Sequence, residues 1–134
     1  MNRNQRIENA QQTLAIVKKG VYVANGREVK IADDVSRSVE GTILYTPDIL
    51  SEMIKDAQIT ETHKTIITVV NQTTMEALRE MKNGRTGCLN FASARNPGGG
   101  FLTGALAQEE SLAAASSLYL SQLKCMAMYE YRRE

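Results

Sequence analysis

Three consecutive glycines follow a proline at residues 97–100, and this stretch constrains the fold more than any other part of the chain. Glycine has no side chain to pack, and it loses more backbone entropy on folding than other residues. Four of the chain's nine glycines nevertheless lie in this one loop: Gly98, Gly99, Gly100 and Gly104. We therefore expect a loop whose main chain must approach another group closely.

The segments that flank this loop predict a strand before it and a helix after it. Residues 86–93 (TGCLNFAS) are typical of a buried strand, and a long helix is expected over residues 108–123. The apolar residues of that helix share one face: Leu112, Ala115, Tyr119 and Leu123. A glycine-rich loop between a strand and a helix can present backbone amides to a phosphate. However, no Lys-Ser/Thr pair follows the glycines and the spacing GxGxxG is missing, so a mobile connector remains the alternative.

The rest of the chain predicts further helices and strands. An amphipathic helix is expected over residues 4–19, with Gly20 ending it, and Asn25-Gly26 predicts the turn of a hairpin over 21–32. Thr46-Pro47 and the Thr73–Glu76 capping-box pattern mark two more helix starts. The remaining expected elements are a loop over 33–41, a short strand over 41–46, a helix over 46–57 that buries Leu50, Met53 and Ile54, a buried strand over 64–70, and a helix from 73 to 83–84.

This order of elements predicts an α/β fold with parallel neighbouring strands. The predicted strands are few, so we expect an incomplete sheet and a single partial domain over residues 1–134. Its N-terminal helical and hairpin region covers residues 1–60, and its core begins in residues 61–134. An incomplete sheet leaves unpaired amides and an apolar face, which favour self-association.

Composition excludes several classes of function. A formal net charge of +1 gives no strong attraction to nucleic acid or anionic lipid. No apolar run approaches the roughly 18 residues of a membrane span, and the N-terminus lacks an apolar signal core, so a cytoplasmic location is expected. Cys88 and Cys125 are expected to be buried thiols. Because His63 is the single histidine, no zinc site is expected, and hydrolytic chemistry would depend on carboxylates.

Glu109 and Glu110 are adjacent at the start of the predicted helix. Neighbouring helical side chains diverge by about 100°, so these two cannot both flank one scissile bond as most glycosidase carboxylates do. At most one can act as an acid/base, and the other must have a different role. The alternative is that both merely complement the helix dipole.

The stretch LNFASARNPGGGFLTGALAQEESLAAASSLY resembles the signature of microbial-type poly(ADP-ribose) glycohydrolases: GGG, seven residues, then QEE. Upstream, TLAIVKKGVY and VVNQTTMEALR resemble the family's N-terminal region. The resemblance implies a macrodomain-like, three-layer α/β/α fold with a mixed sheet that holds ADP-ribose. It also implies hydrolysis of the ribose–ribose O-glycosidic bond of poly(ADP-ribose), which releases ADP-ribose without a metal or cofactor.

The resemblance also assigns roles to residues. Glu110 matches the catalytic glutamate, which serves as a single general acid/base, and Glu109 matches the neighbour that hydrogen-bonds ribose hydroxyls. Gly98, Gly99 and Gly100 match the loop beside the diphosphate and the distal ribose.

Three more positions match the family's site: Asn96 and Ser93 where ribose is contacted, and Gln108 where the helix start is shaped. Family members are longer, and their later segment supplies further strands, a second phosphate-binding loop and an aromatic residue that stacks on adenine. Weak ADP-ribose binding and slow turnover are therefore expected of this chain alone. ADP-ribose or its polymer is the expected ligand, with no nucleic-acid or membrane partner.

The sequence is also compatible with other functions. The chain could be a non-catalytic ADP-ribose or nucleotide-binding module, or an inactive fragment. It could also cleave ADP-ribose from modified DNA or protein, because the matched residues recognise ADP-ribose and do not specify the leaving group.

Overall fold

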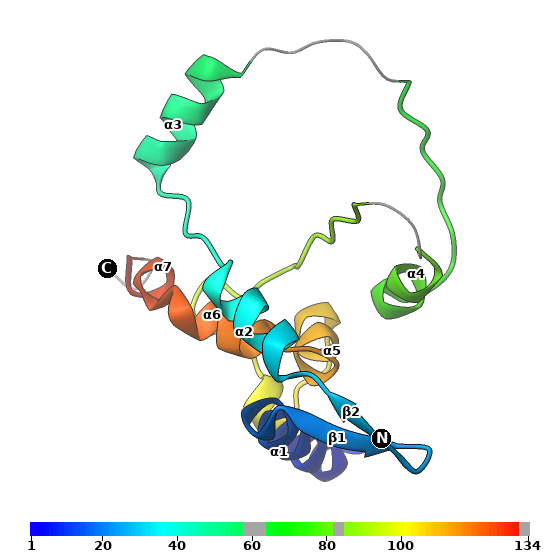
Figure 1. Cartoon of the computed structure of the whole chain (residues 1–134). Coiled ribbons are helices and arrows are strands. Elements are labelled where there is room, and N and C mark those ends of the chain that lie inside the picture. The colour runs from blue at the N-terminus through cyan, green and yellow to red at the C-terminus, as the bar shows by residue number, and fades with distance from the viewer. Residues whose placement is uncertain (58–63, 82–84, 132–134) are drawn as a thin grey trace.

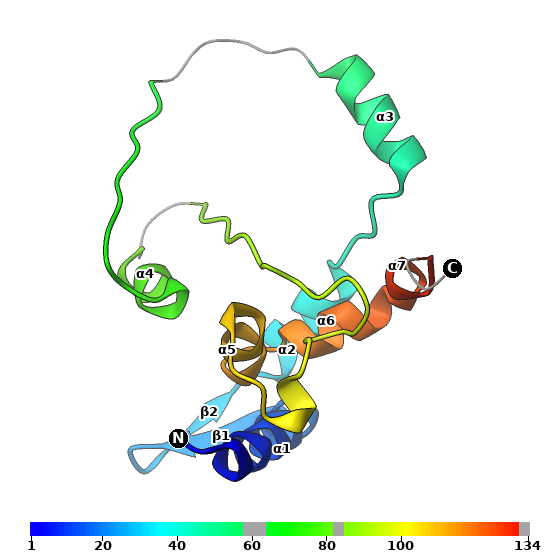
Figure 2. The same ribbon diagram turned by 180° about the vertical axis from the view of Figure 1, so that it is seen from behind.

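The computed structural model describes residues 1–57, 64–81 and 85–131, and His63 and residues 83–84 lie outside these ranges. Most of the described elements form one cluster, from which α3 stands apart (Figures 1 and 2). No helix in these ranges is long and apolar enough to cross a membrane. The elements are α1 (Arg3–Lys19), β1 (Val21–Ala24), β2 (Arg27–Lys30), α2 (Ala32–Glu40), α3 (Pro47–Asp56), α4 (Thr74–Glu80), the short 3-10 helix η1 (Phe101–Thr103), α5 (Gln108–Ala114), α6 (Leu118–Lys124) and α7 (Met126–Tyr131).

Local signals account for the first helix and the hairpin, residues 2–30. Asn2 and Gln5 form a capping box at the start of α1, and Gly20 ends the helix at φ 72°. β1 and β2 pair antiparallel around Asn25 and Gly26, whose positive φ values of 52° and 73° suit a tight hairpin turn. The predicted helix, its glycine stop and the hairpin are therefore confirmed.

The core lies where α1 packs against η1 and α5. Ala10, Phe101 and Ala113 are buried together, with Leu14 and Tyr119 packed partly against them. The small side chains of Ala10 and Ala113 let the helices approach closely around the Phe101 ring. This packing places α1 directly behind the glycine loop and the acidic helix.

Two arginines of α1 bind the end of η1. Arg3 Nε donates to the Thr103 carbonyl at 2.9 Å, and Arg6 Nε donates to the Gly104 carbonyl at 2.7 Å. These charge-assisted hydrogen bonds satisfy carbonyls that the short turn leaves without helical partners. The N-terminal helix thus fixes the distal end of the glycine loop.

The loop predicted over 33–41 is wrong, because the chain forms α2 there. The half-buried Ile31, Val35 and Val39 recur at every fourth residue and form an apolar stripe on one side of this helix. α2 packs against α6. Most of its residues are polar, so the sequence alone indicated a loop.

The single helix predicted over 108–123 is also wrong, because the chain breaks between α5 and α6. Ser116 Oγ donates to the Leu112 carbonyl at 2.7 Å and accepts the Leu118 N–H at 3.2 Å. A serine hydroxyl that binds nearby backbone groups competes with the helical ladder. Thr13 Oγ1 then donates to the Ala114 carbonyl at 2.8 Å, which satisfies the end of α5 from α1.

The mixed α/β class is confirmed, but the only sheet among the described residues is the two-stranded hairpin. The strands predicted over 41–46, 64–70 and 86–93 do not form, because these segments have no ladder partners among the described residues. A strand needs a hydrogen-bonded neighbour to bury its faces, so the apolar side chains of 64–70 point to solvent, with Val69 92% exposed.

Two further burial predictions are wrong. Helix α3 begins after Thr46 as expected, yet Leu50, Met53 and Ile54 are exposed because α3 stands apart from the core. Cys88 is exposed and Cys125 is only half-buried. Helix α4 keeps its capping box but ends at Glu80, earlier than predicted.

Replacing Gly104 with alanine should lower the melting temperature far more than the matched change Gly26→Ala. Both glycines have φ 73°, which strains an alanine by about 1–2 kcal/mol. A Cβ at Gly104 would lie 2.6 Å from the Arg3 carbonyl oxygen, whereas at Gly26 it would meet nothing within 4 Å. Thermal denaturation followed by circular dichroism measures the difference, and equal losses would contradict the close packing of α1 on this loop.

Candidate functional site

The glycine loop is a compact turn held by its own backbone. Gly99 N–H donates to the Asn96 carbonyl at 3.0 Å, and Phe101 N–H donates to the Gly98 carbonyl at 2.9 Å. Gly98 and Gly99 have φ values of 67° and 58°, in the left-handed region that only glycine adopts readily. Gly98 and Gly99 are therefore required by the shape of this turn, whereas Gly100 is required by packing, because a Cβ there would lie 2.5 Å from the Ala105 Cβ.

The second glutamate of the pair, Glu110, lies against this turn. Its Oε1 accepts the Gly100 N–H at 2.8 Å, and its side chain is half-buried. A Cβ on Gly99 would lie 2.6 Å from the same oxygen, so the missing side chain makes room for the carboxyl. The loop and α5 thus bring Glu110 to a defined position on the glycine backbone.

The first glutamate, Glu109, is buried, with 3% of its surface exposed. Its Oε2 accepts the Ser93 N–H at 2.7 Å, and its Oε1 accepts a hydrogen bond from Gln122 Nε2 at 2.6 Å. The two neighbouring glutamates therefore occupy different environments, in agreement with the divergence expected from the helix.

Tyr129 of α7 lies in the same buried region and is 1% exposed. Burial raises the pKa of its phenol, and the nearby negative charge of Glu109 raises that pKa further. Among the residues that the structure describes, its hydroxyl finds no hydrogen-bond partner. The carboxyl of Glu109 consequently lies in an enclosed environment in which its hydrogen bonds are strong.

Gln108 ties the extended segment before the loop to α5. Its Oε1 accepts the Phe91 N–H at 2.8 Å, and its Nε2 donates to the Leu89 carbonyl at 2.8 Å. The amide side chain thus replaces a neighbouring strand for this segment. The N-cap residue of α5, Ala107, makes no side-chain hydrogen bond. The Gln108 side chain instead binds the backbone of residues 89 and 91.

An open cleft of about 710 Å³ runs along the loop, and we call it the glycine-loop cleft. It brings together five of the predicted site residues, while Gly98, Glu109 and Gln108 lie outside its lining. The lining residues are Ser93, Asn96, Pro97, Gly99, Gly100, Leu102, Thr103, Glu110 and Tyr119.

The amides of the three glycines already have acceptors. Gly98 N–H donates to Gln122 Oε1 at 2.9 Å, and Gly99 and Gly100 donate to Asn96 and Glu110. A phosphate could bind these N–H groups only by replacing those acceptors. In this conformation the glycines contribute a wall without side chains.

Two site residues were not found from the sequence. Tyr119 lines the cleft and packs its ring against Phe101, with centroids 5.6 Å apart. The sequence pattern indicates Tyr119 only as part of the apolar face of a helix. Gln122 contacts both Glu109 and Gly98, and no local pattern marks a glutamine that acts across such distances in sequence.

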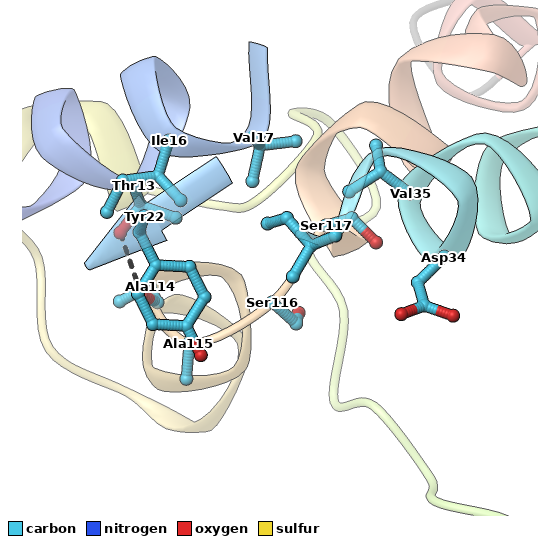
Figure 3. Close-up of a pocket in the computed structure, with 11 residues that line it drawn as sticks. Thr13, Ile16, Val17, Tyr22, Asp34, Val35, Ala114, Ala115, Ser116 and Ser117 are labelled. Atoms are coloured by element: carbon cyan, nitrogen blue, oxygen red, sulfur yellow. Dashed lines mark hydrogen bonds between the residues drawn. The ribbon is translucent and has the colours of Figure 1, made fainter. Parts of the chain in front are cut away.

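A second cavity of about 430 Å³ lies between α1, β1, α2 and the connection from α5 to α6. Figure 3 shows Ile16, Val17 and Tyr22 on this cavity and the Thr13–Ala114 hydrogen bond beside it. None of the predicted site residues lines it. Across residues 1–57, 64–81 and 85–131, no group of three or more His, Cys, Asp or Glu residues could hold a metal ion.

Replacing Gly99 with alanine should displace Glu110 and destabilise the loop. The new Cβ would lie 2.6 Å from Glu110 Oε1 and 2.9 Å from Glu109 Oε2 at a φ of 58°. The Gly100 amide would then lose its acceptor and exchange with solvent faster, by about tenfold for a hydrogen bond of about 1.4 kcal/mol. Hydrogen exchange measured by NMR tests this, with Gly87→Ala, where a Cβ meets nothing within 4 Å, as the control. Unchanged Gly100 exchange would contradict this geometry.

Comparison with solved structures finds poly(ADP-ribose) glycohydrolase (PARG) from Thermomonospora curvata. Its structure matches with a TM-score of 0.90 and 40% sequence identity, covering 98% of this chain and 50% of that chain. The same enzyme bound to the inhibitor ADP-HPD matches at 0.87 and 41% identity, covering 98% of this chain and 48% of that one. A glutamate-to-alanine mutant of it matches at 0.85 and 40% identity, with the same coverage.

The chain spans about half the length of these solved enzymes. No curated protein sequence matches it significantly. A family model, "Microbial-type PARG, catalytic domain", matches residues 10–134, which include the glycine loop, both glutamates and Gln122. The chain therefore belongs to the family of microbial-type PARG catalytic domains.

Proposed function

We propose that this protein hydrolyses the ribose–ribose O-glycosidic bond of poly(ADP-ribose) and releases ADP-ribose, with Glu110 as the single general acid/base. One observation carries the proposal: the Glu110 carboxyl lies on the glycine-loop cleft and is held there by the Gly100 N–H at 2.8 Å. Family membership supports the reaction type, and the relative solved with ADP-HPD supports an ADP-ribose-type ligand.

A single carboxyl can carry both halves of this reaction. In the first half, protonated Glu110 gives its proton to the departing ribose oxygen, and the electron pair of the breaking C–O bond goes to that oxygen. The sugar left behind has oxocarbenium character. In the second half, the Glu110 carboxylate takes a proton from water as the water oxygen bonds to the anomeric carbon. Each turnover restores protonated Glu110.

The surrounding groups fit the recognition of ribose and diphosphate. Ser93 and Asn96 line the same cleft as Glu110 and are proposed to contact ribose. The Gly98–Gly100 backbone is proposed to lie beside the diphosphate and the distal ribose, because it has no side chains to keep them away. The diphosphate charge would then stabilise the developing cation, in place of a second carboxylate.

Glu109 is proposed to accept hydrogen bonds from ribose hydroxyls. Each carboxylate oxygen has two acceptor positions, and each Glu109 oxygen already uses one for Ser93 or Gln122. The remaining positions can receive a ribose hydroxyl where the buried carboxyl borders the loop. A Cβ on Gly99 would lie 2.9 Å from Glu109 Oε2, which shows how close this oxygen is to the glycine backbone.

We also propose that residues 64–70 and 86–93 belong to a larger macrodomain-like sheet, with helices on both sides. The two segments are extended and largely apolar, and Ile66, Ile67 and Phe91 are exposed. The solved relatives contain about as much chain again as the part matched here. These apolar segments are the proposed surface for self-association of the chain.

Sedimentation velocity tests the self-association. The chain is expected to form dimers or larger species, and Ile67→Lys is expected to shift the population toward monomer because a charge on an exposed apolar segment opposes pairing. Glu28→Lys, on an exposed position of β2, serves as the control. A monomer at all concentrations would contradict the proposal.

Replacing Glu110 with glutamine should lower ADP-ribose release from the polymer by about 100-fold or more, since general acid–base catalysis contributes that much. ADP-ribose binding, measured by calorimetry, should persist because Ser93, Asn96 and the glycines remain. Glu28→Gln is the matched control at an exposed glutamate. Release that is insensitive to Glu110→Gln would remove this residue from the mechanism. Binding without release by the unaltered chain would instead favour a non-catalytic ADP-ribose-binding module.

A further inference from the structure

Gln122 joins the two halves of the site through one side chain. Its Oε1 accepts the Gly98 N–H at 2.9 Å, and its Nε2 donates to Glu109 Oε1 at 2.6 Å. Gly98 begins the glycine run, and Glu109 lies in the first turn of α5. The glutamine thus connects the loop to the acidic helix from a third element, α6.

The chemistry of this position selects a primary amide. The Gly98 N–H requires an acceptor and the Glu109 carboxylate requires a donor, and an amide supplies both in one orientation. A glutamate at this position would set two carboxylates against each other, and a leucine would leave both partners without a hydrogen bond. Leaving a buried partner unsatisfied is more costly than the net gain from forming the bond.

Helix α6 is itself fixed by contacts with α2, and these contacts restrict the movement of Gln122. Ser121 Oγ lies 3.1 Å from Ser38 Oγ, and Lys124 Nζ donates to the Glu40 carbonyl at 2.6 Å. One turn before Gln122, Tyr119 touches Gly98, because a Cβ on that glycine would lie 2.9 Å from the tyrosine ring. Two neighbouring residues on one face of α6 therefore contact the loop.

We propose that Gln122 is a positioning residue. It acts through Glu109 to fix the position of the Glu110 carboxyl relative to the glycine loop. Glu109 is fixed on one oxygen by Ser93 and on the other by Gln122, so the first turn of α5 cannot rotate freely. The next residue, Glu110, is thereby kept in reach of the Gly100 N–H. The consequence for catalysis rests on the proposed function, whereas the structural coupling does not.

Two single substitutions and their combination test the coupling. In Glu109→Gln alone, accepting from both Ser93 and Gly98 sets the two amide NH2 groups against each other, so at least one of the three hydrogen bonds is lost in any orientation. In Gln122→Glu alone, two carboxylates oppose each other. In the combination E109Q/Q122E, the amide at position 109 accepts from Ser93 and donates to the carboxylate at position 122, which also accepts from Gly98. All three hydrogen bonds and the net charge return.

Amide hydrogen exchange by NMR is the first readout. Each single variant is expected to speed exchange of Gly98 and Gly100 by about tenfold, the effect of losing about 1.4 kcal/mol. The combination is expected to return both rates to within about threefold of the unaltered chain, since the pair is coupled. Failure of the combination to restore protection would overturn the proposal. This measurement needs neither substrate nor turnover, so it decides the coupling even if the proposed function fails.

Turnover is the second readout. For Gln122→Leu, kcat on poly(ADP-ribose) should fall by about tenfold while KM changes less than threefold, because a misplaced Glu110 matters most when the bond breaks. Gln11→Leu, at an exposed position of α1, is the matched control. A raised KM with unchanged kcat would show that Gln122 serves substrate binding and would overturn the positioning role. Melting temperatures of all variants confirm that they fold.

Discussion

The rest of the site depends on the hydrogen bonds that the buried carboxyl of Glu109 accepts. A carboxylate removed from water is stable only when donors replace its hydration, and here Ser93 and Gln122 supply them. Those two donors come from different segments: Ser93 precedes the glycine loop in the sequence, and Gln122 belongs to α6. By satisfying this single group, the fold therefore brings three separate segments together around the cleft.

The N-terminal helices α1 and α2 pack against the elements that carry the site. Helix α1 packs on η1 and α5, and its arginines Arg3 and Arg6 bind the carbonyls at the distal end of the loop. Helix α2 holds α6, which carries Gln122 and Tyr119. The site residues lie between positions 93 and 122, yet their geometry depends on the first forty residues of the chain.

Local sequence signals predicted local structure well. The Asn25-Gly26 turn, the Gly20 stop and the Thr73 capping box depend on neighbouring backbone only, and each is confirmed. The glycine loop and the place of Glu110 beside it were expected from the motif. Gln122 could not be found, because its partners lie 13 and 24 residues away and no periodicity links them. The strands failed because Val69 and its neighbours lack paired strands among the described residues, and strand identity depends on such partners.

The central claim is that the glycine loop and Glu110 form a ligand site in this chain. A titration of the ¹⁵N-labelled chain with ADP-ribose, followed by amide chemical shifts, tests it most directly. The account predicts the largest shifts at Ser93, Asn96, Gly99 and Gly100, which line the glycine-loop cleft. Shifts centred instead on Val17, Tyr22 and Ser117, around the cavity of Figure 3, or no shifts at saturating ligand, would contradict it.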